Sequence, residues 1–231
     1  MKNITIILLV LIAVSCTSAK KKQSVNVTDL ADRFYEETLL TNPQQAYAND
    51  IPLKDHSLFS SNALSDIKKW EDFEDTLYAD LLTIEKASIA GKSDRITYWL
   101  LKEQLESSIG IRVCKINLWN VNHLSGIHQT WTYLADFQPV ENDTLKQQAF
   151  ERWKKLPRII QTEIDNLKIG IAEGYTMPKE IVSIVIEQLQ TLRDYPLNES
   201  PFMSPAKRIQ DQDFTTNWKD LVTTTVLPAL K

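Results

Sequence analysis

Apolar residues along most of the chain recur at intervals of three and four positions, which places them on one face of an α-helix. Glycine is scarce, with 5 residues in 231, and the alternation of apolar and polar residues typical of a half-exposed strand is nearly absent. The pattern therefore predicts an all-α fold, a multi-helix antiparallel array with long kinked helices and no sheet of consequence.

Capping residues, prolines and glycines predict where these helices begin and end. Thr28 and Thr176 are expected to cap helices through their hydroxyl groups, and Pro157 is expected to kink a long helix, because proline removes one backbone hydrogen bond. The longest helix should bury Ile160, Ile164, Leu167 and Ile171. The predicted helices cover residues 28–42, 64–90, 93–110, 142–174, 178–192 and 213–228.

The first residues have the order of a secretion signal. Met1 and Lys2 precede an apolar run from Ile4 to Val14, too short to cross a hydrocarbon core of about 30 Å. The following Ser15-Cys16 completes a segment similar to the bacterial lipobox, in which the cysteine is acylated. We therefore expect a signal peptide over residues 1–15, a lipid anchor on Cys16, a tether over residues 16–27, and an exported protein anchored to a bacterial membrane on its periplasmic or outer face. Secretion without a lipid is the alternative.

Composition narrows the possible partners. The formal net charge is -4, from 26 basic and 30 acidic residues. The chain therefore has no excess of positive charge that would favour binding of nucleic acid. Cys114 is the one thiol after Cys16, and a lone cysteine forms no internal disulfide. Its apolar neighbours predict a small buried residue rather than a nucleophile.

Residues 117–139 concentrate the polar and aromatic side chains that could line a buried cleft. His123 and His128 are five positions apart, which points them about 140° away from each other on one helix and makes a poor metal pair. The alternative is ordinary core with structural histidines. No catalytic residue or metal ligand is assigned, because the sequence contains no HExxH, CxxC or GxSxG motif. The possible substrate-facing residues are Asn122, His123, His128, Trp131 and Tyr175.

Three motifs in the second half of the chain carry a family resemblance. They are R-W-x-x-L-P-x-x-I from Arg152 to Ile160, G-x-x-x-G-x-x-x-P at Gly170, Gly174 and Pro178, and the Glu187-Gln188-Leu189 segment. With these motifs, the chain from about Phe34 to Lys231 resembles the amino-terminal half of the bacterial domain of unknown function 885 family.

The resemblance implies a large, all-helical, exported and often lipid-anchored protein that is similar to zinc metallopeptidases. Members carry an HExxPGH-type motif in their carboxy-terminal half, and this chain lacks that motif. The resemblance therefore implies that zinc belongs only to that other half, and that residues 28–231 are the amino-terminal part of a larger domain.

Two functional hypotheses follow. In the first, the chain is the non-catalytic amino-terminal portion of such a metallopeptidase-like protein, inactive alone, and forms part of a cleft for a peptide substrate. In the second, it is a stand-alone helical lipoprotein that binds a peptide or a protein partner.

Overall fold

The computed structural model of the protein describes residues 26–231. Every regular element among them is helical, which confirms the predicted all-α multi-helix fold. No helix in this range combines the length and the apolar character needed to cross a membrane. The expected signal peptide, the lipidation of Cys16 and the tether as far as residue 25 lie outside the described residues. These expectations therefore stay predictions.

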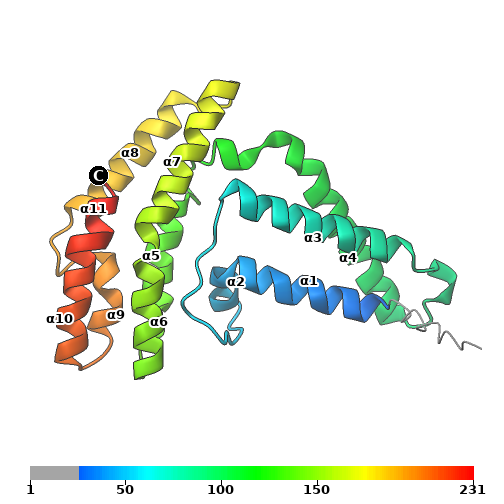
Figure 1. Cartoon of the computed structure of the whole chain (residues 1–231), viewed down its shortest axis with the longest axis horizontal. Coiled ribbons are helices and arrows are strands. Elements are labelled where there is room, and N and C mark those ends of the chain that lie inside the picture. Colours follow the sequence, from blue (N-terminus) through cyan, green and yellow to red (C-terminus); the bar gives the residue numbers. More distant parts are fainter. Residues whose placement is uncertain (1–25) are drawn as a thin grey trace, which may run out of the picture.

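The first part of the fold is a packed group of three helices. α1 (Val27–Thr41), α3 (Leu64–Leu82) and α4 (Lys92–Ile111) contact one another, and the short α2 (Pro43–Ala48) follows α1 (Figure 1). The sequence predicted no helix at α2. Burial of apolar side chains between the three long helices supplies the stability of this part. The buried apolar residues are Val27, Leu30, Leu77, Leu81, Ile89, Tyr98, Leu101 and Leu105.

A second hydrophobic core forms from the remaining helices, which run across the direction of α1 and α3 (Figure 1). Trp153 and Trp218 are fully buried at its centre, and Trp218 Nε1 donates to the carbonyl of Phe202 at 2.8 Å. A π-helical turn over Val222–Val226 joins the last two helices. The elements of this part are α5 (Ile127–Phe137), α6 (Asp143–Trp153), α7 (Leu156–Glu173), α8 (Lys179–Asp194), α9 (Ser204–Lys207), α10 (Gln212–Leu221) and α11 (Leu227–Ala229).

Some predicted helix ends were wrong. Asn26, rather than Thr28, caps α1, because its Oδ1 accepts from the amide of Asp29 at 2.8 Å. The helix expected over residues 64–90 ends at Leu82, before a short 3-10 turn at residues 86–88. Thr176 does not cap α8, which begins after Pro178 without a side-chain cap.

The single kinked helix expected over residues 142–174 is two helices. α6 ends at Trp153 and α7 begins at Leu156. Pro157 lies in the first turn of α7, where a missing amide hydrogen breaks no helical bond. Proline therefore starts a helix here instead of bending one.

The buried face of α7 also differs from the prediction. The helix buries Leu156, Ile159, Glu163, Asn166 and Gly170. Of the four residues expected inside, Ile164 is 40% exposed and Ile171 is 67% exposed. In α4, Leu100 likewise faces outward, and Cys114 is exposed rather than buried.

A buried arginine joins the two parts. Arg152 is fully buried, and its guanidinium donates to the carbonyl of Leu58 at 2.7 Å, to the hydroxyl of Tyr47 at 3.0 Å and to Gln138 Oε1 at 2.8 Å. These acceptors belong to the loop before α3, to α2, and to the turn after α5. Arg152 therefore fixes the position of the loop over residues 49–63 against α6.

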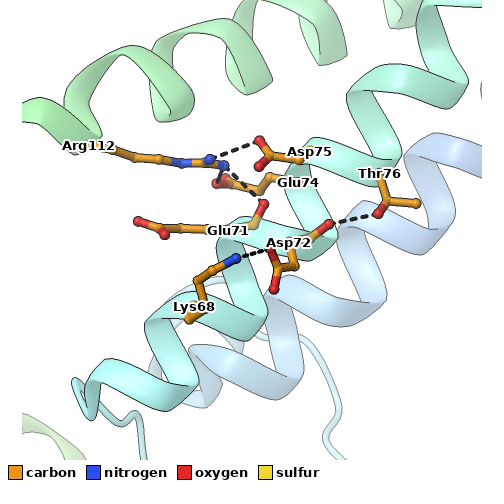
Figure 2. Close-up of polar contacts among 7 residues, drawn as sticks. All are labelled: Lys68, Glu71, Asp72, Glu74, Asp75, Thr76 and Arg112. Carbon is orange, nitrogen blue, oxygen red and sulfur yellow. Dashed lines mark hydrogen bonds and ion pairs between the residues drawn. The ribbon is translucent and has the colours of Figure 1, made fainter.

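A second arginine ties the end of α4 back to α3. Arg112 donates to Glu74 Oε2 at 2.9 Å, to Asp75 Oδ1 at 2.8 Å and to the carbonyl of Glu71 at 3.2 Å (Figure 2). The carboxylate of Glu74 is almost completely buried, so this pairing offsets the cost of removing its charge from water. The chain leaving α4 is thus anchored before it crosses to α7.

The chain segment after α4 packs closely against α7, and this close approach depends on a glycine. The short helix η3 (Ile116–Leu118) lies so close to Gly170 that a Cβ atom there would be 2.0 Å from the carbonyl oxygen of Leu118. Gly174, four residues later, ends α7 in a left-handed conformation with φ 85°. The first glycine of the G-x-x-x-G motif therefore permits a backbone contact, and the second one ends the helix.

Gly170→Ala should destabilise the protein by about 1–3 kcal/mol, because the new methyl group meets backbone that must move. The matched control is Gly110→Ala in α4, where no heavy atom lies within 4 Å of the position of the added Cβ. Alanine should stabilise that helix by up to about 1 kcal/mol. Urea denaturation of both variants measures the difference, and equal effects would contradict the close crossing.

Candidate functional site

A pocket of about 250 Å³ lies between α5, α7 and α8. We call it the apolar pocket. Its lining is mostly aliphatic and it is partly open to solvent, which is typical of sites that accept an apolar group. The chain segments after α10 contribute Ala229, Leu230 and Lys231 to its rim. Its aliphatic lining residues are Ile127, Ile160, Ile164, Leu167, Val185 and Leu189, with Val121 from the segment before α5.

Three of the five predicted substrate-facing residues line this pocket: Asn122, His128 and Trp131. His123 and Tyr175 do not line it. Tyr175 instead lies after α7 beneath Lys115, whose Nζ is 5.5 Å from the centre of the ring. The structure thus brings part of the predicted set together, and contact with substrate stays a prediction for all five.

Gln188 of α8 links the two histidines. Its Nε2 donates to the main-chain carbonyl of His123 at 3.0 Å, and its Oε1 lies 2.9 Å from His128 Nε2. Because the first bond fixes the orientation of the amide, His128 must carry its proton on Nε2. Gln188 therefore holds the imidazole in one tautomer and fastens the segment before α5 to α8.

The turn that leads into the first residues of α5 is tightly packed. A Cβ atom at Gly126 would lie 2.1 Å from the carbonyl of Asn122 and 2.7 Å from the imidazole of His128. Asn122 Oδ1 accepts from the amides of Leu124 at 2.8 Å and Ser125 at 3.1 Å, which turns the chain into the helix. Glycine and asparagine therefore place His128 and Trp131 at the pocket.

Trp131 presents an unsatisfied polar atom. The side chain is 3% exposed and lines the pocket, and its Nε1 donates to no acceptor among the described residues. Leaving a buried donor unpaired costs about 1–3 kcal/mol. Trp153 Nε1 in the second hydrophobic core is unpaired in the same way.

Glu163 is the main site residue that sequence reasoning missed. It lines the pocket, is 7% exposed and accepts from Asn62 Nδ2 at 2.7 Å. Burial raises the pKa of this carboxyl, while hydrogen bonds from Asn62 and Asn120 lower it in part. The available signal was the spacing of Ile159, Glu163, Asn166 and Gly170, which places a polar pair on the buried face of α7.

The donor groups of these residues do not fit a zinc ion. In the described range, no three His, Cys, Asp or Glu side chains gather closely enough to bind a metal. His56 bonds the hydroxyl of Tyr47 at 2.7 Å, far along the chain from the pair that Gln188 links. A catalytic zinc requires three protein ligands and an open position, so we derive no metal-dependent step from this site.

A family model described as "Bacterial protein of unknown function (DUF885)" matches residues 43–231. The matched span includes every residue of the apolar pocket and all three sequence motifs noted above. No curated protein matches the chain.

Glu163→Gln tests the environment of the buried carboxyl. A raised pKa in the folded state means that this group's contribution to stability is complete below the unfolded-state pKa and is lost as the pH rises through the folded-state pKa. Glutamine keeps an oxygen for Asn62 and removes the titration. Relative to the wild type, the variant should therefore become more stable as the pH rises from 4 to 8.

Urea denaturation at both pH values measures this gain. Glu151→Gln, an exposed glutamate on α6, is the control and should change stability little at either pH. A difference between Glu163→Gln and the wild type that is the same at pH 4 and pH 8 would contradict a raised pKa.

Proposed function

The chain belongs to the bacterial DUF885 family, and on that premise we propose that it forms one wall of a cleft that binds a peptide. The observation that carries the proposal is the partly open pocket of about 250 Å³ whose lining is mostly aliphatic. A peptide can fill such a pocket with an apolar side chain, while its main chain bonds the polar groups around it.

The buried polar groups support binding at a fixed position. His128 and Glu163 line the pocket, and each is held from behind by a hydrogen bond, His128 by Gln188 and Glu163 by Asn62. These bonds hold the site in shape before a ligand arrives, and preorganisation lowers the entropy lost on binding. The aliphatic lining supplies affinity, and the polar groups orient the main chain of the ligand.

The role proposed for residues 26–231 is binding, not bond cleavage. In the family that the sequence resembles, zinc and the HExxPGH-type motif belong to a carboxy-terminal half, so this chain would contribute the non-catalytic part of a metallopeptidase-like protein. The alternative is a stand-alone helical lipoprotein that binds a peptide or protein partner. Both roles use the same pocket, and they differ in whether a second half completes the cleft.

We also propose that the protein is exported and held at a bacterial membrane by a lipid on Cys16. The support is the order of the first sixteen residues: a basic start, a short apolar run, and Ala13-Val14-Ser15 before the cysteine. Two or more acyl chains anchor a protein durably, since each buried methylene contributes about 0.8 kcal/mol. The apolar pocket would then bind its ligand outside the cytoplasm.

Ile164→Asp tests the pocket, because a partly exposed side chain can change there without disturbing the core. With the blocked peptide Ala-Ala-Ala-Leu as probe, calorimetry should show at least about tenfold weaker binding, since the charge must lose water when the leucine enters. The matched control is Ile171→Asp on the same helix, which is exposed and outside the pocket. Equal affinity in both variants would refute binding at this site.

Cys16→Ser tests the anchor. The wild-type protein should be found in the membrane fraction, and mass spectrometry should find a diacylglycerol adduct on the amino-terminal cysteine. The serine variant cannot be acylated at this position and should be released into the soluble fraction. An unmodified, soluble amino terminus in the wild type would refute the proposed anchor.

A further inference from the structure

Two more pockets continue from the apolar pocket toward α1. A middle pocket of about 170 Å³ shares Asn120, Ile127 and Trp131 with it. An acidic pocket of about 390 Å³, between α1 and α3, shares Asn42, Phe59, Ser60 and Asn62 with the middle pocket. Because neighbouring pockets share lining residues, the three lie next to one another along the loop before α3 and the segment before α5.

We propose that the three pockets form one groove that binds an extended peptide, with an apolar side chain at one end and a basic side chain at the other. The inference rests on the proposed function and adds a substrate class to it. The apolar side chain occupies the apolar pocket, and a lysine or arginine side chain occupies the acidic pocket. The peptide main chain lies across the middle pocket.

The middle pocket is suited to a peptide main chain because carboxamide side chains line it. Gln44 accepts from the hydroxyl of Ser60 at 2.6 Å through Oε1, while its Nε2 has no acceptor in the described part of the chain. Asn42 Oδ1 likewise receives no hydrogen bond from residues 26–231. A peptide unit carries one donor and one acceptor, and these two amides offer one of each.

Asn62 joins the middle pocket to the apolar pocket. Its Nδ2 bonds Glu163 Oε1 at 2.7 Å, and its main-chain carbonyl accepts from Asn166 at 2.7 Å. Asn62 therefore brings the loop before α3 against α7 and makes both pockets parts of one surface. A ligand that follows this loop passes Trp131, which lines both pockets.

The acidic pocket favours a cation. Asp66 is paired with Lys69 at 2.8 Å, whereas Glu37 has no cationic partner in the described residues. Glu37 therefore supplies an uncompensated negative charge to the lining. Trp70 lines the same pocket, and an aromatic face attracts a lysine or arginine side chain.

The apolar pocket distinguishes a peptide from an oligosaccharide. Amide, hydroxyl and aromatic side chains suit either ligand, and both could occupy the middle and acidic pockets. A sugar has no aliphatic branch to fill a site lined by Ile160, Leu167 and Val185, whereas a leucine side chain does. A peptide therefore matches all three pockets together.

The test uses the full chain and blocked tetrapeptides in both directions, Arg-Ala-Ala-Leu and Leu-Ala-Ala-Arg, because the groove does not fix the ligand's direction. In the direction that binds more tightly, replacing arginine by neutral citrulline should weaken binding about tenfold by calorimetry. Glu37→Gln should weaken binding of the arginine peptide by a similar factor and leave the citrulline peptide unchanged. Glu36→Gln, an exposed neighbour on α1 that lines no pocket of the groove, is the control and should change neither.

The outcomes separate this inference from the proposed function. Equal binding of arginine and citrulline peptides, with binding still lost in Ile164→Asp, would overturn the groove and keep the apolar pocket. Failure of every peptide to bind would overturn both. Tighter binding of chitotetraose than of any peptide would also overturn the inference, because it would show that a sugar occupies the groove.

Discussion

A buried guanidinium determines how the two parts of this protein meet. Arg152 has no carboxylate among its hydrogen-bond partners, and its charge is held by neutral oxygens from Leu58, Tyr47 and Gln138. A buried charge costs several kcal/mol, and these bonds offset part of that cost although Arg152 Nη2 has no partner among the described residues. The three segments that supply the acceptors are therefore held together. The loop before α3 is also held at other points, since Gln148 accepts from the amide of His56 at 3.2 Å and Lys155 donates to the carbonyl of Ser57 at 2.9 Å. Arg152 acts together with these bonds, and Asn62 is held by its own bonds to α7.

Close backbone approaches complete the geometry of the site. Gly170 lets η3 lie against α7, and Gly126 lets the turn before α5 fold against His128. Gln188 then fastens that turn to α8. Each contact is a main-chain approach or a bond to the main chain. The proposed groove therefore depends on how segments cross, and its side chains come mainly from α1, α3, α5, α7 and α8 and from the loops before α3 and α5.

The sequence predicted the fold class, because helical periodicity and scarce glycine are local properties. It placed most helices, and it identified Asn122, His128 and Trp131 as neighbours in one segment. It failed where burial depends on the partner helix. Ile164 and Ile171 look like core from their spacing, yet α7 turns Glu163 and Asn166 inward, because Asn62 and its main chain supply hydrogen bonds there. The sequence could not predict the acidic pocket for a similar reason, since Glu37 and Trp70 come from helices that meet only in the folded protein.

Hydrogen–deuterium exchange of the full chain, with and without the tighter-binding tetrapeptide, tests the central claim most directly. If a peptide lies along a groove held in place by Arg152, slower exchange should appear together in the loop over residues 58–62, in residues 120–131 and at the end of α1. The amides of α10, which lies away from all three pockets, should be unchanged. Protection confined to α8 or α10, with none in residues 58–62, would contradict the account.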